Sequence, residues 1–245
     1  MSLFEAQVKS LRTLLEAHEI QPIARAASPL PDARAQAGLI LQHEALCELG
    51  STQNRSALSL VYTNATGGDA ARLIGTWPIA SGQTTADFGL VVILGGERLD
   101  AETFYRFTLR FPRLADHPGW MVKTDKTKIW IRVGGRDDGN VLEIAAASLI
   151  ERIHAAFEAV ESVELFFVVN ESALIESLQP LAEQCQRQLR ALKTGVWQQR
   201  GFDYESCELA GHCGSCSDKK TCASVRKIQA KVHLVRKEQA KEKEQ

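Results

Sequence analysis

Residues 88–96 read FGLVVILGG, an apolar run that ends in two glycines. A run of this length, rich in branched side chains and followed by glycine, predicts a buried β-strand. The segment DAETFYRFTLRF (100–111) then predicts a helix, with Asp100 as its N-cap and Pro112 at its end. WMVKTDKTKIWIRV (120–133) predicts two short strands around a polar turn.

The following residues complete a pattern that begins at this strand. Residues 134–140 (GGRDDGN) predict a loop, and residues 141–160 predict a helix that turns four apolar side chains toward the core: Leu142, Ala145, Leu149 and Ile153. VELFFVV (163–169) predicts another buried strand. The order β-α-β-β-α-β is that of a ferredoxin-like sandwich, so the sequence predicts an α+β fold with a ferredoxin-like core.

The residues before this core predict two helices and two strands. Residues 3–18 place apolar side chains on one face of an amphipathic helix, and a second helix is expected to end near Gly50. Residues 56–63 (SALSLVYT) alternate like a strand. Residues 73–80 predict a further strand, which we expect at a sheet edge because Pro78 cannot donate to a ladder.

A long helix is expected after the core, over residues 172–198, with Pro180 restarting it at a first-turn position. The sequence thus divides into four expected parts: an N-terminal helical segment over 1–50, an α+β domain over 51–200, a four-cysteine segment over 201–225 and a basic C-terminal helix over 226–245.

The composition is that of a globular protein, with 44% apolar and 24% charged residues. No apolar run is long enough to cross a bilayer, and the charged N-terminus lacks the pattern of a signal peptide. We therefore expect no membrane span and a cytoplasmic location, where clustered cysteines bind metal more often than they form disulfides. The net charge of −1 conceals a basic tail, because residues 218–245 carry nine Lys or Arg against four acids.

Four of the six cysteines stand together in CELAGHCGSCSDKKTC (207–222). Their spacing is C-x5-C-x2-C-x5-C, formed by Cys207, Cys213, Cys216 and Cys222. The central pair can bring two thiolates to one metal centre. The flanking gaps are short enough for the other two thiolates to reach the same centre. Four thiolates suit a tetrahedral zinc ion or the four corners of a [4Fe–4S] cluster, and the spacing leaves both open. The simplest role for either is a structural metal site that closes this part of the chain.

From residue 88 to about 222, the order of segments resembles the beta subunit of the anaerobic CO dehydrogenase/acetyl-CoA synthase complex. The stretches that carry the resemblance are FGLVVILGGERLD, KIWIRVGG, IERIHAAFEAVESVELFFVVNESALIESLQPL and YESCELAGHC. The resemblance implies that a [4Fe–4S] cluster is held by Cys207, Cys213, Cys216 and Cys222. It also implies an iron–sulfur protein that serves as an electron-transfer or accessory subunit, beside a protein partner, in an anaerobic one-carbon or acyl-CoA metabolic complex.

The sequence departs from that family at the cysteines. The family begins with its short cysteine gap, whereas here the short gap is in the middle, and its nickel-binding Cys-Gly-Cys does not follow Cys222. We therefore expect no nickel site and no acetyl-CoA synthesis by this chain alone, and catalytic residues stay unassigned. An enzyme subunit whose cluster is completed by another chain is a second hypothesis. The third is a zinc-stabilised four-cysteine module that binds nucleic acid or protein, with nucleic acid the less expected partner because acids interrupt the bases of the tail.

Five further side chains are predicted to have structural roles. Trp120 and Trp130 flank the expected hairpin and are predicted to pack in the core or across strands. His154 lies on a predicted helix without an evident carboxylate and nucleophile that would make it catalytic. Cys47 and Cys185 stand alone on predicted helices and are expected to be small buried residues.

Overall fold

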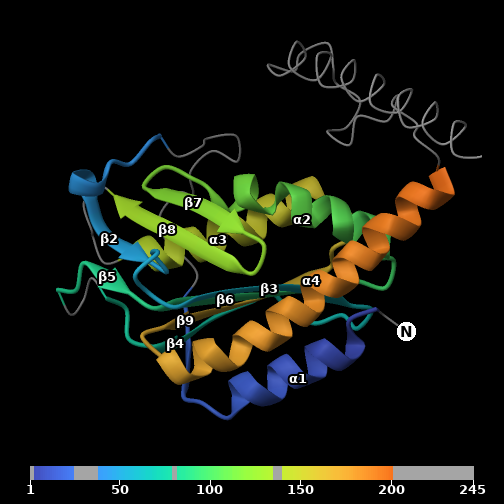
Figure 1. The fold of residues 1–245 in the computed structure, drawn as a ribbon, viewed down its shortest axis with the longest axis horizontal. Helices are drawn as coiled ribbons and strands as arrows, with labels where there is room; N and C mark the ends of the chain where they lie inside the picture. Colours follow the sequence, from blue (N-terminus) through green and yellow to red (C-terminus); the bar gives the residue numbers. More distant parts are fainter. Residues whose placement is uncertain (1–2, 25–37, 79–81, 135–139, 201–245) are drawn as a thin grey trace, which may run out of the picture. The chain divides into compact units, whose positions relative to one another are not determined.

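Two β-sheets lie at the centre of the fold in this computed structural model (Figure 1). The structure describes residues 3–24, 38–78, 82–134 and 140–200, and the side chains as far as Leu189. The chain separates into two compact units, Met1–Gly195 and Val196–Gln245.

The larger sheet has five strands in the order β1-β4-β9-β6-β3. Its central strands are almost wholly buried, as expected for strands covered on both faces. β3 and β6 run parallel, whereas β6 and β9 are antiparallel. In sheet order, the strand bounds are Ile20–Pro22 (β1), Ala70–Gly75 (β4), Ser162–Val169 (β9), Phe88–Gly95 (β6) and Ser56–Thr63 (β3).

The smaller sheet has four strands in the order β5-β2-β8-β7. β7 and β8 form the hairpin that the sequence predicts, and β2 pairs with the other side of β8. The strand bounds are Thr85–Ala86 (β5), Ala45–Leu49 (β2), Lys128–Gly134 (β8) and Trp120–Asp125 (β7), and a short 3-10 turn, Gln42–Glu44, precedes β2.

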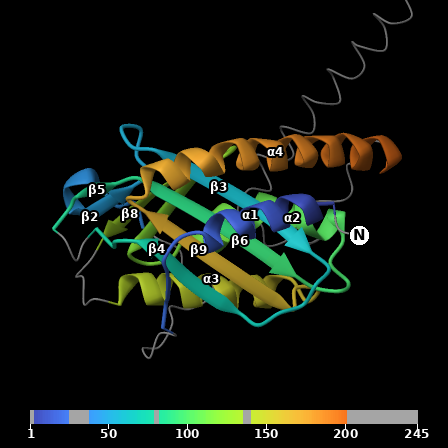
Figure 2. The same cartoon turned by 90° about the horizontal axis from the view of Figure 1, so that it is seen from below.

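Helices cover the larger sheet in two groups (Figures 1 and 2). α1 and the first part of α4 lie on one face, where an added Cβ at Gly89 of β6 would be 3.4 Å from Leu178 of α4. α2, α3 and the smaller sheet lie on the other face. The helix bounds are Glu5–Glu16 (α1), Ala101–Ala115 (α2), Val141–Ala156 (α3) and Ser172–Arg200 (α4). None of the described helices combines the length and apolar character that a bilayer crossing requires.

The α+β class and the predicted β-α-β-β-α-β order are both confirmed, from β6 through α2, β7, β8 and α3 to β9. All four side chains predicted to face inward from α3 are buried: Leu142, Ala145, Leu149 and Ile153. β6 and β9 are antiparallel neighbours, as in a ferredoxin-like core. The predicted ferredoxin-like sandwich is nevertheless wrong, because its four strands do not share one sheet: β3 occupies the place beside β6, and β7 and β8 lie in the second sheet, where β8 also pairs with β2.

Two predictions for the N-terminal part are wrong. The residues before Gly50 form strand β2 and not the end of a helix, because pairing with β8 and the 2.6 Å ion pair between Arg132 and Glu48 stabilise an extended backbone. Residues 38–41 of that expected helix are also not helical and Gln42–Glu44 form only a 3-10 turn, whereas the residues before 38 lie outside the described part of the chain. β4 is also not an edge strand: it lies between β1 and β9 and ends before Pro78.

Both prolines expected to delimit helices lie inside them. α2 continues past Pro112 to Ala115, and α4 continues past Pro180. A proline in a helix removes one backbone hydrogen bond, so the surrounding turns need other stabilisation. Buried side chains on each side supply it, namely Phe111 and Ala115 in α2 and Leu178 and Ala182 in α4.

Candidate functional site

The four predicted metal ligands, Cys207, Cys213, Cys216 and Cys222, lie outside the described residues, as does the basic tail. Within the part of the chain that the structure describes, no group of three or more His, Cys, Asp or Glu side chains is placed to hold a metal ion.

The two remaining cysteines are buried, as predicted. Cys47 is 1% exposed and Cys185 is 2% exposed. Cys185 lies on α4 as expected, but Cys47 lies on strand β2 and not on a helix. Burial raises the pKa of the Cys185 thiol to about 12, so this residue stays protonated at neutral pH. Because metals bind the thiolate, Cys185 is a poor metal ligand.

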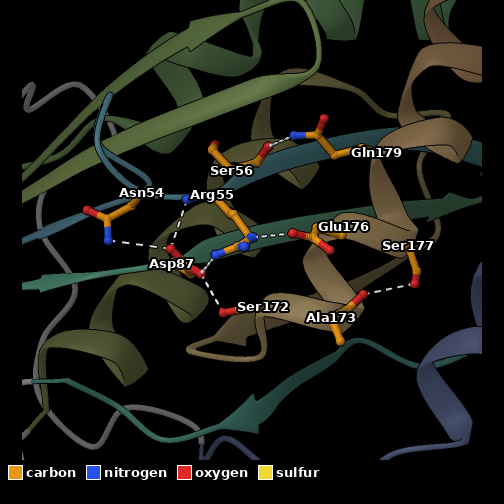
Figure 3. Close-up of polar contacts among 9 residues, drawn as sticks. All are labelled: Asn54, Arg55, Ser56, Asp87, Ser172, Ala173, Glu176, Ser177 and Gln179. Carbon is orange, nitrogen blue, oxygen red and sulfur yellow. Dashed lines mark hydrogen bonds and ion pairs between the residues drawn. The ribbon is translucent and has the colours of Figure 1, made fainter.

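A polar network around Asp87 anchors the start of α4 (Figure 3). The Asp87 carboxylate is nearly buried and accepts hydrogen bonds from the backbone N–H of Arg55 at 2.8 Å and from the Ser172 hydroxyl at 2.6 Å. Burial alone raises the pKa of Asp87, but the hydrogen bonds from Ser172, Arg55 and Asn54 outweigh it and hold that pKa below its usual value. Asp87 is therefore an ionised carboxylate whose hydrogen-bonding capacity is used within the fold.

The same network extends along α4. The Arg55 guanidinium pairs with Glu176, and the Gln179 amide donates to the backbone oxygen of Ser56 at 2.6 Å (Figure 3). These contacts join the first turns of α4 to the start of β3. The network has the chemistry of a structural clamp, since its carboxylates accept hydrogen bonds and ion pairs from neighbouring elements.

A pocket with a volume of about 260 Å³ opens between β3, α2, the β7–β8 turn and α4. Its apolar lining comes from Leu58 and Leu60 of β3, Phe111 of α2 and Leu189 of α4. Lys126 of the turn also belongs to the lining. The pocket therefore combines hydrocarbon walls with one cationic residue.

A second buried cluster surrounds His117, where α2 joins β7. Its ring stacks on Trp120 at 6.0 Å between ring centroids, and Trp120 stacks in turn on Trp77 at 6.0 Å. Burial, and to a lesser extent the charge of Arg152, lowers the pKa of His117 to about 4, although a hydrogen bond to the Pro118 carbonyl acts in the opposite direction. His117 Nε2 is buried without a hydrogen-bond partner in the described part of the chain.

The packing roles expected for the two hairpin tryptophans are confirmed. Trp120 is buried in the stack beside His117. Trp130 is partly buried and lies against the cations of Lys123 and Arg132, which are 5.0 and 4.5 Å from its ring centroid. Such contacts stabilise the hairpin across its strands.

His154 has the carboxylate partner that the sequence does not reveal. Its Nε2 lies 2.9 Å from Asp69 Oδ1, and its Nδ1 lies 3.2 Å from the carbonyl oxygen of Val160. Asp69 also accepts a hydrogen bond from the backbone N–H of Val163 at 2.9 Å. The pair therefore fixes the loop before β4 against α3 and β9, which is a structural role.

Comparison with known proteins adds no family to these observations. Neither a protein-family model nor a curated protein sequence matches the chain. A proposal for the function therefore depends on this chain's own residues. These are the four cysteines with their spacing and the contacts of the body, which is the described part of the first unit.

Proposed function

We propose that this chain is a [4Fe–4S] protein that acts as an electron-transfer or accessory subunit of an anaerobic one-carbon or acyl-CoA metabolic complex. The observation that carries the proposal is the spacing of Cys207, Cys213, Cys216 and Cys222, which provides four thiolates within one short segment. The resemblance of segment order to the acetyl-CoA synthase subunit supports iron–sulfur over zinc and suggests the kind of complex.

The burial of the two cysteines in the body supports this ligand set. Cys47 and Cys185 are enclosed by apolar side chains of the core, and Cys185 is held as a thiol. A cluster assembles on accessible thiolates, so these two residues are unsuited to replace a ligand. The proposed set is thus limited to the four cysteines of residues 207–222.

Electron transfer is the reaction that four thiolate ligands favour. When bound, a [4Fe–4S] cluster accepts or releases single electrons, and four cysteines occupy one ligand position on each iron. The chain's own contribution is to bind the cluster and to set its potential through the charge and hydrogen bonds of the segment. Lys219 and Lys220 lie among the cysteines in sequence and offset part of the negative charge of such a site.

The body has a separate role in the proposal, which is to hold α4 and to dock the partner. α4 begins in the Asp87 network and continues to Arg200, a short distance in sequence before Cys207. These contacts anchor the first turns of α4 to the sheet, so the proposal assigns this part of the chain to holding the helix and docking the partner.

Single cysteine variants test the ligand set. Each of the four cysteines is replaced by serine, the protein is purified without oxygen, and bound iron per chain is measured. The variants C47A and C185A serve as matched controls, because they remove a buried cysteine without removing a proposed ligand. We expect each of the four serine variants to lose most of the bound iron and both controls to retain it.

Retention of full iron in C213S or C216S contradicts the ligand set, since these residues form the central C-x2-C. Loss of iron in C47A, with the fold intact by circular dichroism, also contradicts it. A colourless protein that binds about one zinc per chain supports the alternative, a four-cysteine zinc module for protein or nucleic acid.

A further inference from the structure

The pocket between β3, α2, the β7–β8 turn and α4 has the character of a small-ligand site. An engineered cavity of about 150 Å³ lined by apolar side chains accepts benzene. The present pocket, at about 260 Å³, therefore has room for a hydrocarbon group of roughly six to eight carbon atoms. Leu58, Leu60, Phe111 and Leu189 provide the apolar contacts for such a group.

The positive charge beside the pocket indicates which polar group a ligand would carry. Lys126 is the one charged residue in the described lining, and its side chain is exposed. Thr124 adds a hydroxyl group to the same lining, whereas the Thr108 hydroxyl donates to the Tyr105 carbonyl at 2.8 Å. An exposed ammonium beside a hydroxyl group favours a carboxylate over a cation or an uncharged head group.

The turn that carries Lys126 is fixed in place by two other elements. Lys126 has a φ of 54°, in the left-handed region that is strained for a residue other than glycine. The Gln186 amide of α4 donates to the Lys126 carbonyl at 3.1 Å, and the Leu58 N–H of β3 donates to the Thr127 carbonyl at 2.7 Å. The cation is thus attached to a turn that both pocket walls hold in position.

The mouth of the pocket is open to solvent. Leu109 of α2 is part of the lining and is 50% exposed, so it lies at the solvent side of the pocket. An exposed apolar side chain at the mouth can cover the hydrocarbon part of a bound molecule.

We propose that this pocket binds a small amphipathic carboxylate, with its hydrocarbon chain against Leu58, Leu60, Phe111 and Leu189 and its carboxylate at Lys126. The site is independent of the cysteine segment, so it goes beyond the proposed iron–sulfur function. Occupancy of the pocket also bridges α2, the β7–β8 turn and α4, and a bound ligand stabilises the fold that contains these three elements.

Equilibrium dialysis of the full chain with radiolabelled octanoate tests the proposal at neutral pH, where octanoate is ionised. We expect saturable binding of one octanoate per chain, with weaker binding of uncharged octanol. K126M removes the cation and is expected to weaken octanoate binding about two- to fivefold, as for the loss of one exposed ion pair. K128M is the matched control, because Lys128 is also exposed but does not line the pocket, and it is expected to bind like the wild type.

A second variant tests the location by filling the pocket. T124F places an aromatic ring in the lining at a strand position that tolerates it, and it is expected to weaken octanoate binding by at least about tenfold. Circular dichroism and the melting temperature verify that the variant is folded. Absence of saturable binding in the millimolar range overturns the proposal, as does wild-type binding by K126M or by folded T124F. Metal content is measured in the same samples, and binding is expected whichever metal the cysteines hold, so failure here leaves the proposed function standing.

Discussion

Acid sensitivity of the fold is expected to depend on His117. This histidine is 3% exposed, and its pKa falls from 6.5 to about 4 in the folded chain, chiefly because burial disfavours the charged ring and secondarily because Arg152 repels it. As the pH falls below 6.5, the unfolded chain binds a proton that the folded chain does not. The free energy of unfolding therefore decreases until the pH reaches about 4, where the folded chain is protonated as well.

The magnitude follows from the size of this pKa difference. A depression from 6.5 to about 4, at 1.36 kcal/mol for each unit, corresponds to a loss of about 3 kcal/mol of stability over that interval. At pH 8, well above 6.5, the histidine is almost entirely neutral in both states and contributes almost no pH dependence. This loss is a large fraction of the stability of an ordinary domain, so it is measurable by unfolding in urea.

The assay compares urea unfolding of wild type and H117Q at a series of pH values from 8 to 4.5, followed by tryptophan fluorescence. Glutamine does not titrate, so the stability of wild type relative to H117Q is expected to fall by about 2–3 kcal/mol between the two ends of the series. H43Q, which changes an exposed histidine, is expected to follow the wild type. Identical pH dependence of wild type and H117Q contradicts this prediction, because it shows that His117 is not the group that titrates.

Three further predictions concern other contacts of the body. D87N is expected to lower the free energy of unfolding by about 2–3 kcal/mol because the carboxylate of the α4 clamp loses its charge, whereas D125N, at an exposed position, changes it by less than about 0.5 kcal/mol in the same urea titration. G75A is expected to lower the melting temperature far more than G82A. Both glycines have a positive φ, but an added Cβ at Gly75 would lie 1.9 Å from the Val169 oxygen, whereas nothing lies within 4 Å of one at Gly82. Equal melting temperatures of the two variants contradict this prediction. Cys185, with a pKa of about 12, is expected to remain unlabelled by iodoacetamide in the folded chain at pH 8 and to react in urea. Mass spectrometry of the peptides measures the labelling, and a labelled Cys185 in the folded chain contradicts the prediction.

Local sequence patterns predict the middle of the fold well. The apolar run at β6, the polar turn between β7 and β8, and the helical period of α3 each occupy one continuous stretch of sequence. Such elements are specified by their own residues. Their types, their order and the inward face of α3 therefore follow from the sequence alone.

Strand pairing between distant residues is what the sequence does not reveal. Residues 45–49 (ALCEL) have the composition of a helix, but pairing with β8 makes them a strand. The choice of β3 and not β8 as the neighbour of β6 likewise depends on long-range contacts. Local propensity carries no information on these choices, so the division into two sheets could not be predicted.

The polar contacts of the body also could not be predicted from the sequence, because they join residues that are far apart along the chain. His154 and Asp69 are separated by 85 residues, and Asp87 meets Ser172 across a similar distance. Neither pair forms a recognisable motif. The cysteine segment is the opposite case, because its four candidate ligands lie close together in sequence and their spacing alone predicts a metal site.

The most direct test of the central claim is the analysis of iron, acid-labile sulfide and zinc, together with an absorption spectrum, on wild-type protein purified without oxygen. We expect a brown protein with about four irons and four sulfides per chain and a broad visible absorption that bleaches on reduction. A colourless protein with about one zinc and no sulfide contradicts the iron–sulfur function and leaves the four cysteines as a zinc site.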